Sequence, residues 1–325
     1  MKARQPGHRC QSWRVRLLMV GAMLLCVPAA AQPVDGTLNR QPLLVPWSTL
    51  AGARMTAQPN PLPALPGQPD FRGYLGWLSP TAVAVRGNYM YVVDGGRRQI
   101  FLYDLAQQTL TPFAEYSAGS VSSITIAPDM SLYVADTVAR QVLHFSVDGR
   151  LLRTIGNALE MARPVAVLLD ESTGNLLVAD GLFNHVVVFN SLGRVLSVLR
   201  PRENRSIAAM AGGPDGLYLL DRLSRQVVVI GPDGADRYTL GNGTLKSPDA
   251  IAVDRFNRVF VSDSFDNTIK IYEHGQWLAT FGGSGATPTS FNRITGLWLQ
   301  QDMLYVADSL NARIQTFRVA PRKRG

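Results

Sequence analysis

The chain of 325 residues is 46% hydrophobic and 17% charged, and it contains 29 Gly and 20 Pro. This composition is too apolar for a disordered chain and too rich in glycine for a helical bundle. A formal charge of +8 would suit a nucleic-acid or anionic-membrane partner, provided that the basic residues cluster on a working surface.

The first predicted element is an export signal at residues 1–31. Basic residues without any acidic residue precede an apolar run, 17–27, and small residues follow up to Ala31. This order is typical of secretory signal peptides, so we expect cleavage after Ala31 and a periplasmic or secreted bacterial protein. Lipid attachment at Cys26 is the less favoured alternative, because Leu25 is larger than the residue that usually precedes a lipidated cysteine. We expect no transmembrane helix in the mature chain, since the apolar run is too short to span a bilayer.

Removal of this signal changes the charge and the cysteine content. The mature chain keeps 27 basic against 24 acidic residues and has no cysteine, because Cys10 and Cys26 both lie in the signal. Cysteine catalysis and disulfides are therefore excluded for the mature protein. Most of the remaining excess of basic over acidic residues lies at the C-terminal end, where residues 320–325 form a basic tail. We therefore expect no nucleic-acid partner.

Residues 32–69 are predicted to form a leader. Five prolines fall between Pro59 and Pro69, which favours an extended polyproline conformation. The leader would lie along the wall of the following domain or dock a partner, and Leu43–Trp47 would anchor it in either case.

A repeat fills residues 70–319. An apolar run that ends in aspartate returns at intervals of 42, 44, 41, 42 and 45 residues. The six aspartates are Asp94, Asp136, Asp180, Asp221, Asp263 and Asp308. Short β-branched and aromatic runs separated by turn residues fill each unit, as in 248–283, which contains four strands. A period in the low forties with four strands per unit predicts an all-β fold, a six-bladed β-propeller. The last unit has three strands, so we expect an N-terminal strand near 70–77 to complete it and close the ring.

The segment Val306–Phe317, with Asp308, Asn311 and Arg313, resembles the NHL repeat, and weaker copies cover residues 71–319. The resemblance implies a six-bladed propeller, but propellers of this kind include scaffolds, RNA binders, amidating lyases and lactonases. The fold therefore does not determine the function.

The repeated aspartates are predicted to be structural. Each can accept hydrogen bonds from turn amides and pair with a basic or amide side chain four or five residues later. These later residues are Arg98, Arg140, Asn184, Arg225, Asn267 and Arg313. A catalytic role would not require six equivalent acids.

The channel mouth offers little for catalysis. The first strands are expected to begin near Thr81, Ser122, Val165, Ile207, Asp249 and Thr295. Asp249 is the single carboxylate and a weak candidate metal ligand, whereas calcium binds six to eight oxygens. His144, His185 and His274 lie at unrelated positions of their blades, so they do not form a metal-binding set. We expect no metal, no cofactor and no nucleophilic triad.

The sequence therefore predicts a non-enzymatic scaffold that binds a protein or a cell-envelope glycan through loops on one face of the ring. The predicted contact set comprises Trp77, Arg163, Arg205, Asp249, Phe265 and Phe291. The alternative is a lactonase-like hydrolase or amidating-lyase-like enzyme that uses Ca or Zn at the channel mouth.

Overall fold

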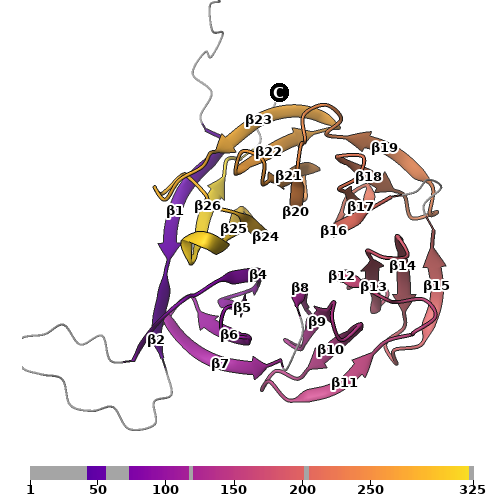
Figure 1. Ribbon diagram of the computed structural model, residues 1–325, viewed down its shortest axis with the longest axis horizontal. Coiled ribbons are helices and arrows are strands. Elements are labelled where there is room, and N and C mark those ends of the chain that lie inside the picture. The colour runs from indigo at the N-terminus through magenta and orange to yellow at the C-terminus, as the bar shows by residue number, and fades with distance from the viewer. Residues whose placement is uncertain (1–41, 56–72, 117–119, 201–204, 322–325) are drawn as a thin grey trace, which may run out of the picture. The chain divides into compact units, whose positions relative to one another are not determined.

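The computed structural model describes residues 42–55, 73–116, 120–200 and 205–321. These residues form six sheets arranged as blades around a central channel, each blade built on four antiparallel strands (Figure 1). The prediction of an all-β six-bladed propeller is confirmed. The predicted signal at 1–31 lies outside the described residues, as do most of the leader and the end of the basic tail.

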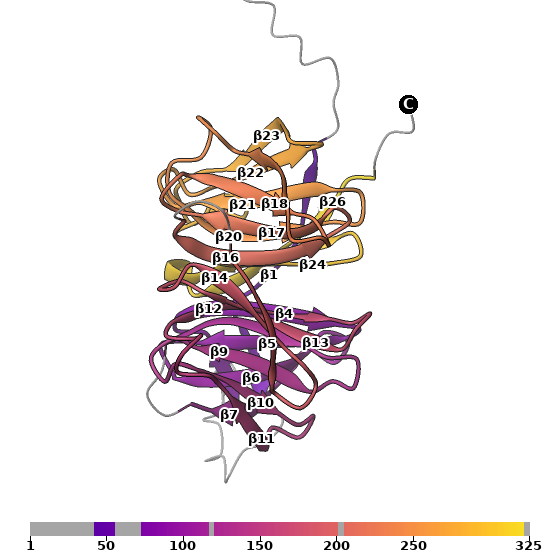
Figure 2. The ribbon, with the colours of Figure 1, turned by 90° about the vertical axis from the view of Figure 1, so that its right-hand side faces the viewer.

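Blades 1 to 3 come first along the chain, and Figure 2 shows the ring from its side. Blade 1 contains β4 (Pro80–Arg86), β5 (Tyr89–Asp94), β6 (Gln99–Asp104) and β7 (Thr109–Glu115). Blade 2 contains β8 (Val121–Ile126), β9 (Leu132–Asp136), β10 (Gln141–Phe145) and β11 (Leu151–Ile155). Blade 3 contains β12 (Pro164–Asp170), β13 (Asn175–Asp180), β14 (His185–Phe189) and β15 (Val195–Leu199).

Blades 4 to 6 complete the ring. Blade 4 contains β16 (Ile207–Gly213), β17 (Gly216–Asp221), β18 (Gln226–Ile230) and β19 (Asp236–Leu240). Blade 5 contains β20 (Pro248–Val253), β21 (Arg258–Asp263), β22 (Thr268–Glu273) and β23 (Gln276–Gly282). Blade 6 contains β24 (Ile294–Gln300), β25 (Met303–Asp308), the short 3-10 helix η1 (Ser309–Asn311) and β26 (Arg313–Val319).

The hydrophobic core lies between the blades. Each hydrophobic cluster among the described residues joins two neighbouring sheets, as where Tyr218 of blade 4 packs in one cluster with Tyr272 of blade 5. The second strand of a blade is covered on both sides, so β17 is buried almost throughout. The fourth strand is the outermost, and the side chains of β15 are mostly exposed or half-buried. This difference explains why the second strands are continuously apolar in the sequence.

The ring is closed by an earlier segment than the sequence indicated. The fourth strand of blade 6 is β1 (Leu44–Leu50), in which Leu44 lies opposite Val319 (Figure 1). The prediction that residues 70–77 supply this strand is wrong, although closure by an N-terminal strand is correct. The strand β3 (Tyr74–Gly76) instead pairs with β2 (Gly52–Met55) at the outer edge of blade 1.

Residues 44–55 therefore join two blades. The strand β1 pairs with β26 of blade 6, and β2 pairs in parallel with β7 of blade 1, Met55 lying opposite Leu110. A hydrogen bond from the Trp77 indole nitrogen to the Leu50 carbonyl oxygen (3.1 Å) fastens this segment between the two blades. Within the described ranges, no helix is long and apolar enough to cross a membrane.

Candidate functional site

The six repeated aspartates lie at one face of the ring, which we call the aspartate face. Because neighbouring strands run antiparallel, the turn after the second strand and the start of the first strand share this face. All six carboxylates are 0–3% exposed. Asp180 shows their role: Oδ2 accepts from the backbone N–H groups of Ala162 and Arg163, and Oδ1 accepts from those of Leu182 and Phe183. One carboxylate thus ties the connection between blades to the turn within a blade.

The predicted pairing of each aspartate with a later side chain is present in blade 6. There the Arg313 Nε donates to Asp308 Oδ2 at 2.7 Å. At the other five positions the residue adopts a left-handed backbone with φ of 54–57°. These residues are Arg98, Arg140, Asn184, Arg225 and Asn267. The turn requires a left-handed backbone four residues after the aspartate, and this requirement, rather than an ion pair, explains the repeated residue there. In blade 6 the left-handed residue at this position is Ala312.

Large apolar side chains project from the aspartate face. In five blades the second residue after the aspartate is apolar and 59–70% exposed, and in blade 1 Leu78 is 54% exposed beside Gly96. We call this set the apolar ring: Leu78, Val138, Leu182, Leu223, Phe265 and Leu310. Turn tips are normally polar, because an exposed apolar side chain gains nothing from folding. The apolar ring is therefore a recurring exposed feature of this face.

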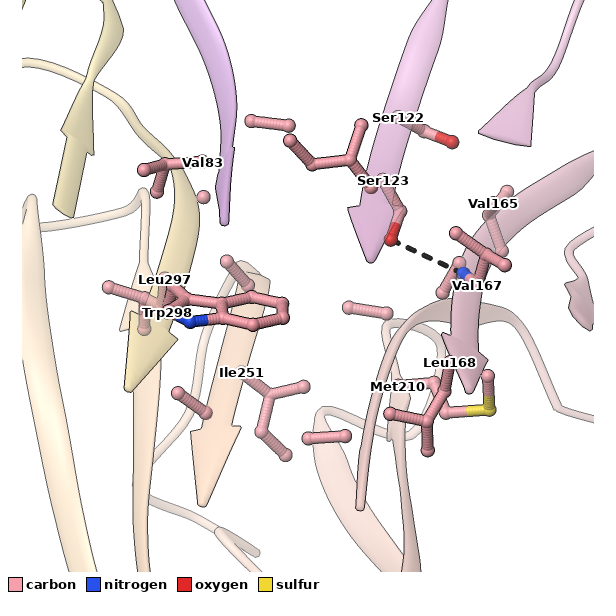
Figure 3. Close-up of a pocket in the computed structure, with 18 of the residues that line it drawn as sticks. Val83, Ser122, Ser123, Val165, Val167, Leu168, Met210, Ile251, Leu297 and Trp298 are labelled. Atoms are coloured by element: carbon pink, nitrogen blue, oxygen red, sulfur yellow. Dashed lines mark hydrogen bonds between the residues drawn. The ribbon is translucent and has the colours of Figure 1, made fainter. Parts of the chain in front are cut away.

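The channel at the centre of this face is mainly aliphatic (Figure 3). Its cavity of about 200 Å³ is lined by the first strands, which begin within one residue of the predicted positions. Figure 3 shows the Trp298 ring extending into the cavity toward Ile251. The Trp298 indole nitrogen donates to the Val85 carbonyl oxygen at 2.9 Å, so the ring is fixed there. The channel is thus lined by mainly aliphatic side chains and few polar side chains.

The hydroxyl groups at the channel hold neighbouring blades together. The Ser123 hydroxyl accepts from the Val167 N–H at 3.2 Å, as Figure 3 shows. The hydroxyls of Ser122 and Thr295 donate to proline carbonyl oxygens of adjacent blades. The Asp249 carboxylate accepts from the Arg222 guanidinium at 2.6 Å. These polar groups already have partners within the ring, and the arrangement contains no activated nucleophile among the described residues.

Three residues of the predicted contact set are buried. Trp77 packs edge-on against Phe101. Phe291 packs against Phe317 in the layer between blades 5 and 6. Arg205 is buried and donates to the Asp236 carboxylate. These side chains lie in connections between blades, as expected, but they fold inward against the core and offer no surface to a partner.

The other three predicted residues lie on the aspartate face, although they do not gather into one cluster. Phe265 is exposed at the turn of blade 5. Arg163 is exposed beside blade 3, where its guanidinium donates to the Gly181 carbonyl oxygen at 3.0 Å. Asp249 is half-buried at the channel mouth. The apolar ring was missed apart from Phe265, although an apolar residue stands two positions after five of the six aspartates in the sequence, Asp94 being followed there by Gly96.

The histidines lie away from the channel. His185 contacts the Glu160 carbonyl oxygen through Nε2 at 2.6 Å. His144 is buried and stacks on Tyr133. His274 is exposed in a turn of the opposite face. Across the described residues, no group of three or more His, Cys, Asp or Glu side chains is placed to hold a metal ion.

The hydrogen bonds of Ser131 and His144 do not have the direction that nucleophilic catalysis requires. Arg153 Nε donates to His144 Nδ1 at 3.2 Å, so the proton of the neutral ring is on Nε2 and points to the Ser131 hydroxyl at 3.1 Å. Ser131 in turn donates to Asp129 at 2.6 Å. A base must accept the proton of a serine nucleophile, and here the hydroxyl donates elsewhere. Burial, with Arg153 as a second cause, lowers the pKa of His144.

Comparisons with known proteins identify the fold and no family. No family model matches the chain, and no curated protein matches it in sequence. Virginiamycin B lyase from Staphylococcus aureus is 12% identical over 75% of this chain and 96% of its own, with a TM-score of 0.59. A structure of streptogramin B lyase is 13% identical over 73% of this chain and 78% of its own, with a TM-score of 0.56. A protein of unknown function from Bacteroides thetaiotaomicron is 16% identical over 75% of this chain and 70% of its own, with a TM-score of 0.63. At these identities the likeness concerns the propeller fold, and the resemblance to NHL repeats stays a prediction.

Proposed function

We propose that the protein is a non-enzymatic extracytoplasmic scaffold that binds another protein through its aspartate face. The apolar ring is the observation that carries this proposal, because it places one exposed apolar side chain on every blade. Protein interfaces obtain most of their affinity from a few large side chains that lose their water on contact. A cell-envelope glycan is the weaker partner, since aliphatic side chains such as Leu182 and Leu223 offer its hydroxyl groups no hydrogen bonds.

The turns that carry the apolar ring are rigid, which favours binding. Leu182 follows two residues after Asp180, and its own N–H is held by that carboxylate. Phe265 is held in the same way by Asp263. A side chain on a fixed turn loses less conformational entropy when a partner covers it than one on a mobile loop.

The extracytoplasmic location rests on the sequence of residues 1–31. Mass spectrometry of the protein recovered from its host tests this part separately. A mature N-terminus at Gln32 supports export by a cleaved signal peptide. An acyl group on Cys26 would instead identify a membrane-anchored lipoprotein, and retention of Met1 would refute export.

The binding proposal is tested by removing part of the apolar ring. A triple variant, Leu182→Ser, Leu223→Ser and Phe265→Ser, removes three neighbouring members of the ring. The matched control is Val147→Ser, Leu192→Ser and Phe256→Ser, because these apolar residues are exposed in turns of the opposite face. Tagged mature forms are used to capture proteins from an envelope extract, which is read by mass spectrometry. We expect the wild type and the control to retain a common partner and the ring variant to lose it at unchanged thermal stability. Equal recovery with the ring variant would refute binding through this face.

The second candidate function is an enzyme at the channel mouth. It is supported by the fold shared with virginiamycin B lyase and by Asp249 at the mouth. In this case Ca or Zn should copurify stoichiometrically, and added metal should raise the melting temperature. A metal-free protein that shows no thermal shift with either ion would exclude the metal-dependent form of this candidate.

A further inference from the structure

A second cavity opens on the aspartate face, between blades 4 and 5. It is an open depression with a volume of about 460 Å³. Arg225 comes from the turn between β17 and β18, and Phe265 comes from the corresponding turn of blade 5. The connection from β19 to β20 supplies Asn242, Leu245 and Lys246. We call this cavity the inter-blade pocket.

The walls of the inter-blade pocket are fixed by the repeated aspartate. The Asp263 carboxylate accepts from the N–H of Lys246 at 2.8 Å and from that of Phe265 at 3.1 Å. Leu245 is buried, and its N–H donates to the Gly241 carbonyl oxygen. The Thr244 hydroxyl lies 2.6 Å from that of Tyr272, which joins the connection to blade 5. The pocket therefore exists before any ligand binds.

Two cations border this pocket without an acidic partner. Arg225 and Lys246 are exposed, and neither forms an ion pair with a described residue. Three basic residues nearby are paired, by contrast, in the contacts Arg205–Asp236, Arg222–Asp249 and Lys270–Asp266. Arg225 and Lys246 therefore place positive charge at the pocket.

An aromatic wall accompanies the positive charge. The Lys246 ammonium group lies 4.3 Å from the centre of the Phe265 ring, a cation–π contact that holds it over the pocket. Phe265 also belongs to the apolar ring, and Leu223 is exposed in the turn that carries Arg225. A ligand that fits must combine negative charge with an adjacent apolar group. Acidic peptide segments with interspersed Leu or Phe have this combination.

We propose that the inter-blade pocket binds a carboxylate side chain in an acidic, apolar-containing segment of the protein partner. This inference rests on the proposed function and specifies the chemistry of the partner. The guanidinium and ammonium groups bind the carboxylate, while Phe265 covers the neighbouring apolar side chain. Binding weakens with added salt, because both cations are exposed.

The test uses the mature protein and a fluorescein-labelled peptide, Leu-Glu-Glu-Phe-Glu-Glu-Leu, with binding measured by fluorescence anisotropy. The double variant Arg225→Gln and Lys246→Gln should weaken binding about tenfold, as expected for loss of two exposed ion pairs. Glutamine suits position 225, since Gln108 and Gln301 adopt the same left-handed backbone in this chain. The control Arg194→Gln and Arg255→Gln removes equal charge from exposed residues in turns of the opposite face.

The expected results are specific to the carboxylate. A peptide with Gln in place of every Glu should bind at least tenfold more weakly, and the control variant should bind like the wild type. The inference is overturned if the wild type does not bind the acidic peptide, or if inorganic tripolyphosphate displaces it as well as unlabelled peptide does, which would indicate an unselective anion site. If the double variant binds the peptide normally, the pocket inference fails, while the proposed function is decided separately by the capture of an envelope protein through the apolar ring.

Discussion

The aspartate turns allow a quantitative comparison between blades. In Asp180→Asn, one carboxylate oxygen becomes an NH₂ group that faces two backbone N–H donors. In Asp263→Asn, an amide oxygen placed at Oδ1 still accepts from Ser247 and Phe265, so that only the N–H of Lys246 at Oδ2 loses its acceptor. A buried N–H without an acceptor costs about 1–3 kcal/mol. We therefore expect Asp180→Asn to lower the free energy of unfolding by about 2–6 kcal/mol and Asp263→Asn by about half as much.

Urea unfolding followed by intrinsic fluorescence measures both losses, provided that the slope with denaturant stays constant. The comparison tests the role assigned to the carboxylates, since both are buried aspartates at equivalent positions of the repeat. The reasoning is that the number of N–H groups left without an acceptor determines the loss in the free energy of unfolding. Equal losses in the two variants, or a loss below about 1 kcal/mol for Asp180→Asn, would refute it.

Two further substitutions test ring closure and the buried histidine. Leu44→Ala should lower the free energy of unfolding by about 2–5 kcal/mol, because Leu44 is fully buried in the closing strand. Trp47 is exposed in the same strand, so Trp47→Ala should change the free energy of unfolding by less than about 1 kcal/mol. Urea unfolding measures both values, and equal effects would contradict closure by this strand. The lowered pKa of His144 means that the unfolded chain binds this proton more readily, so stability is present above the ordinary histidine pKa of about 6.5 and is lost as the pH falls below it. His144→Gln should therefore show a smaller fall in melting temperature than the wild type between pH 7 and pH 5, and an identical fall would contradict this assignment.

The repeat could be predicted because its signal lies in the best-buried strands. Second strands such as β5 and β17 are covered on both sides, so nearly every position is constrained to be apolar. The aspartate at the strand end is constrained as well, because its carboxylate satisfies several backbone groups at once. Buried strands and obligatory hydrogen bonds give a periodic pattern in the sequence, which is why the number of blades was predicted correctly.

The closing strand could not be located in the same way. In β1, Leu44 is buried and the following residues are exposed apart from the half-buried Leu50, so the strand has no alternating pattern. It also contains Pro46, which is tolerated because β1 forms the outer edge of its sheet. Its position is determined by pairing with β26, which is more than 250 residues away, and not by local sequence.

Some predicted contact residues are buried, because the position of a residue in a loop does not determine whether its side chain is exposed. Trp77 and Phe291 lie in connections, yet the space between neighbouring blades accepts their rings. The sequence does not show which connection residue turns inward, because that depends on the gap left by the facing blade. Gly282 illustrates this point: a Cβ there would lie 2.4 Å from the Phe291 ring, so the absence of a side chain makes room for it.

The same carboxylates link the stability of the ring to its proposed binding. Asp263 fixes the backbone of Phe265, of Lys246 and hence of the inter-blade pocket, and Asp180 fixes that of Leu182. Removing an apolar side chain should therefore weaken binding without affecting folding, whereas Asp263→Asn should impair both. In Asp263→Asn the bound partner should restore part of the lost melting temperature, because a ligand that binds only the ordered connection at Lys246 stabilises the folded state. A variant that binds its partner normally despite the loosened connection would show that preorganisation by the aspartate contributes nothing to recognition.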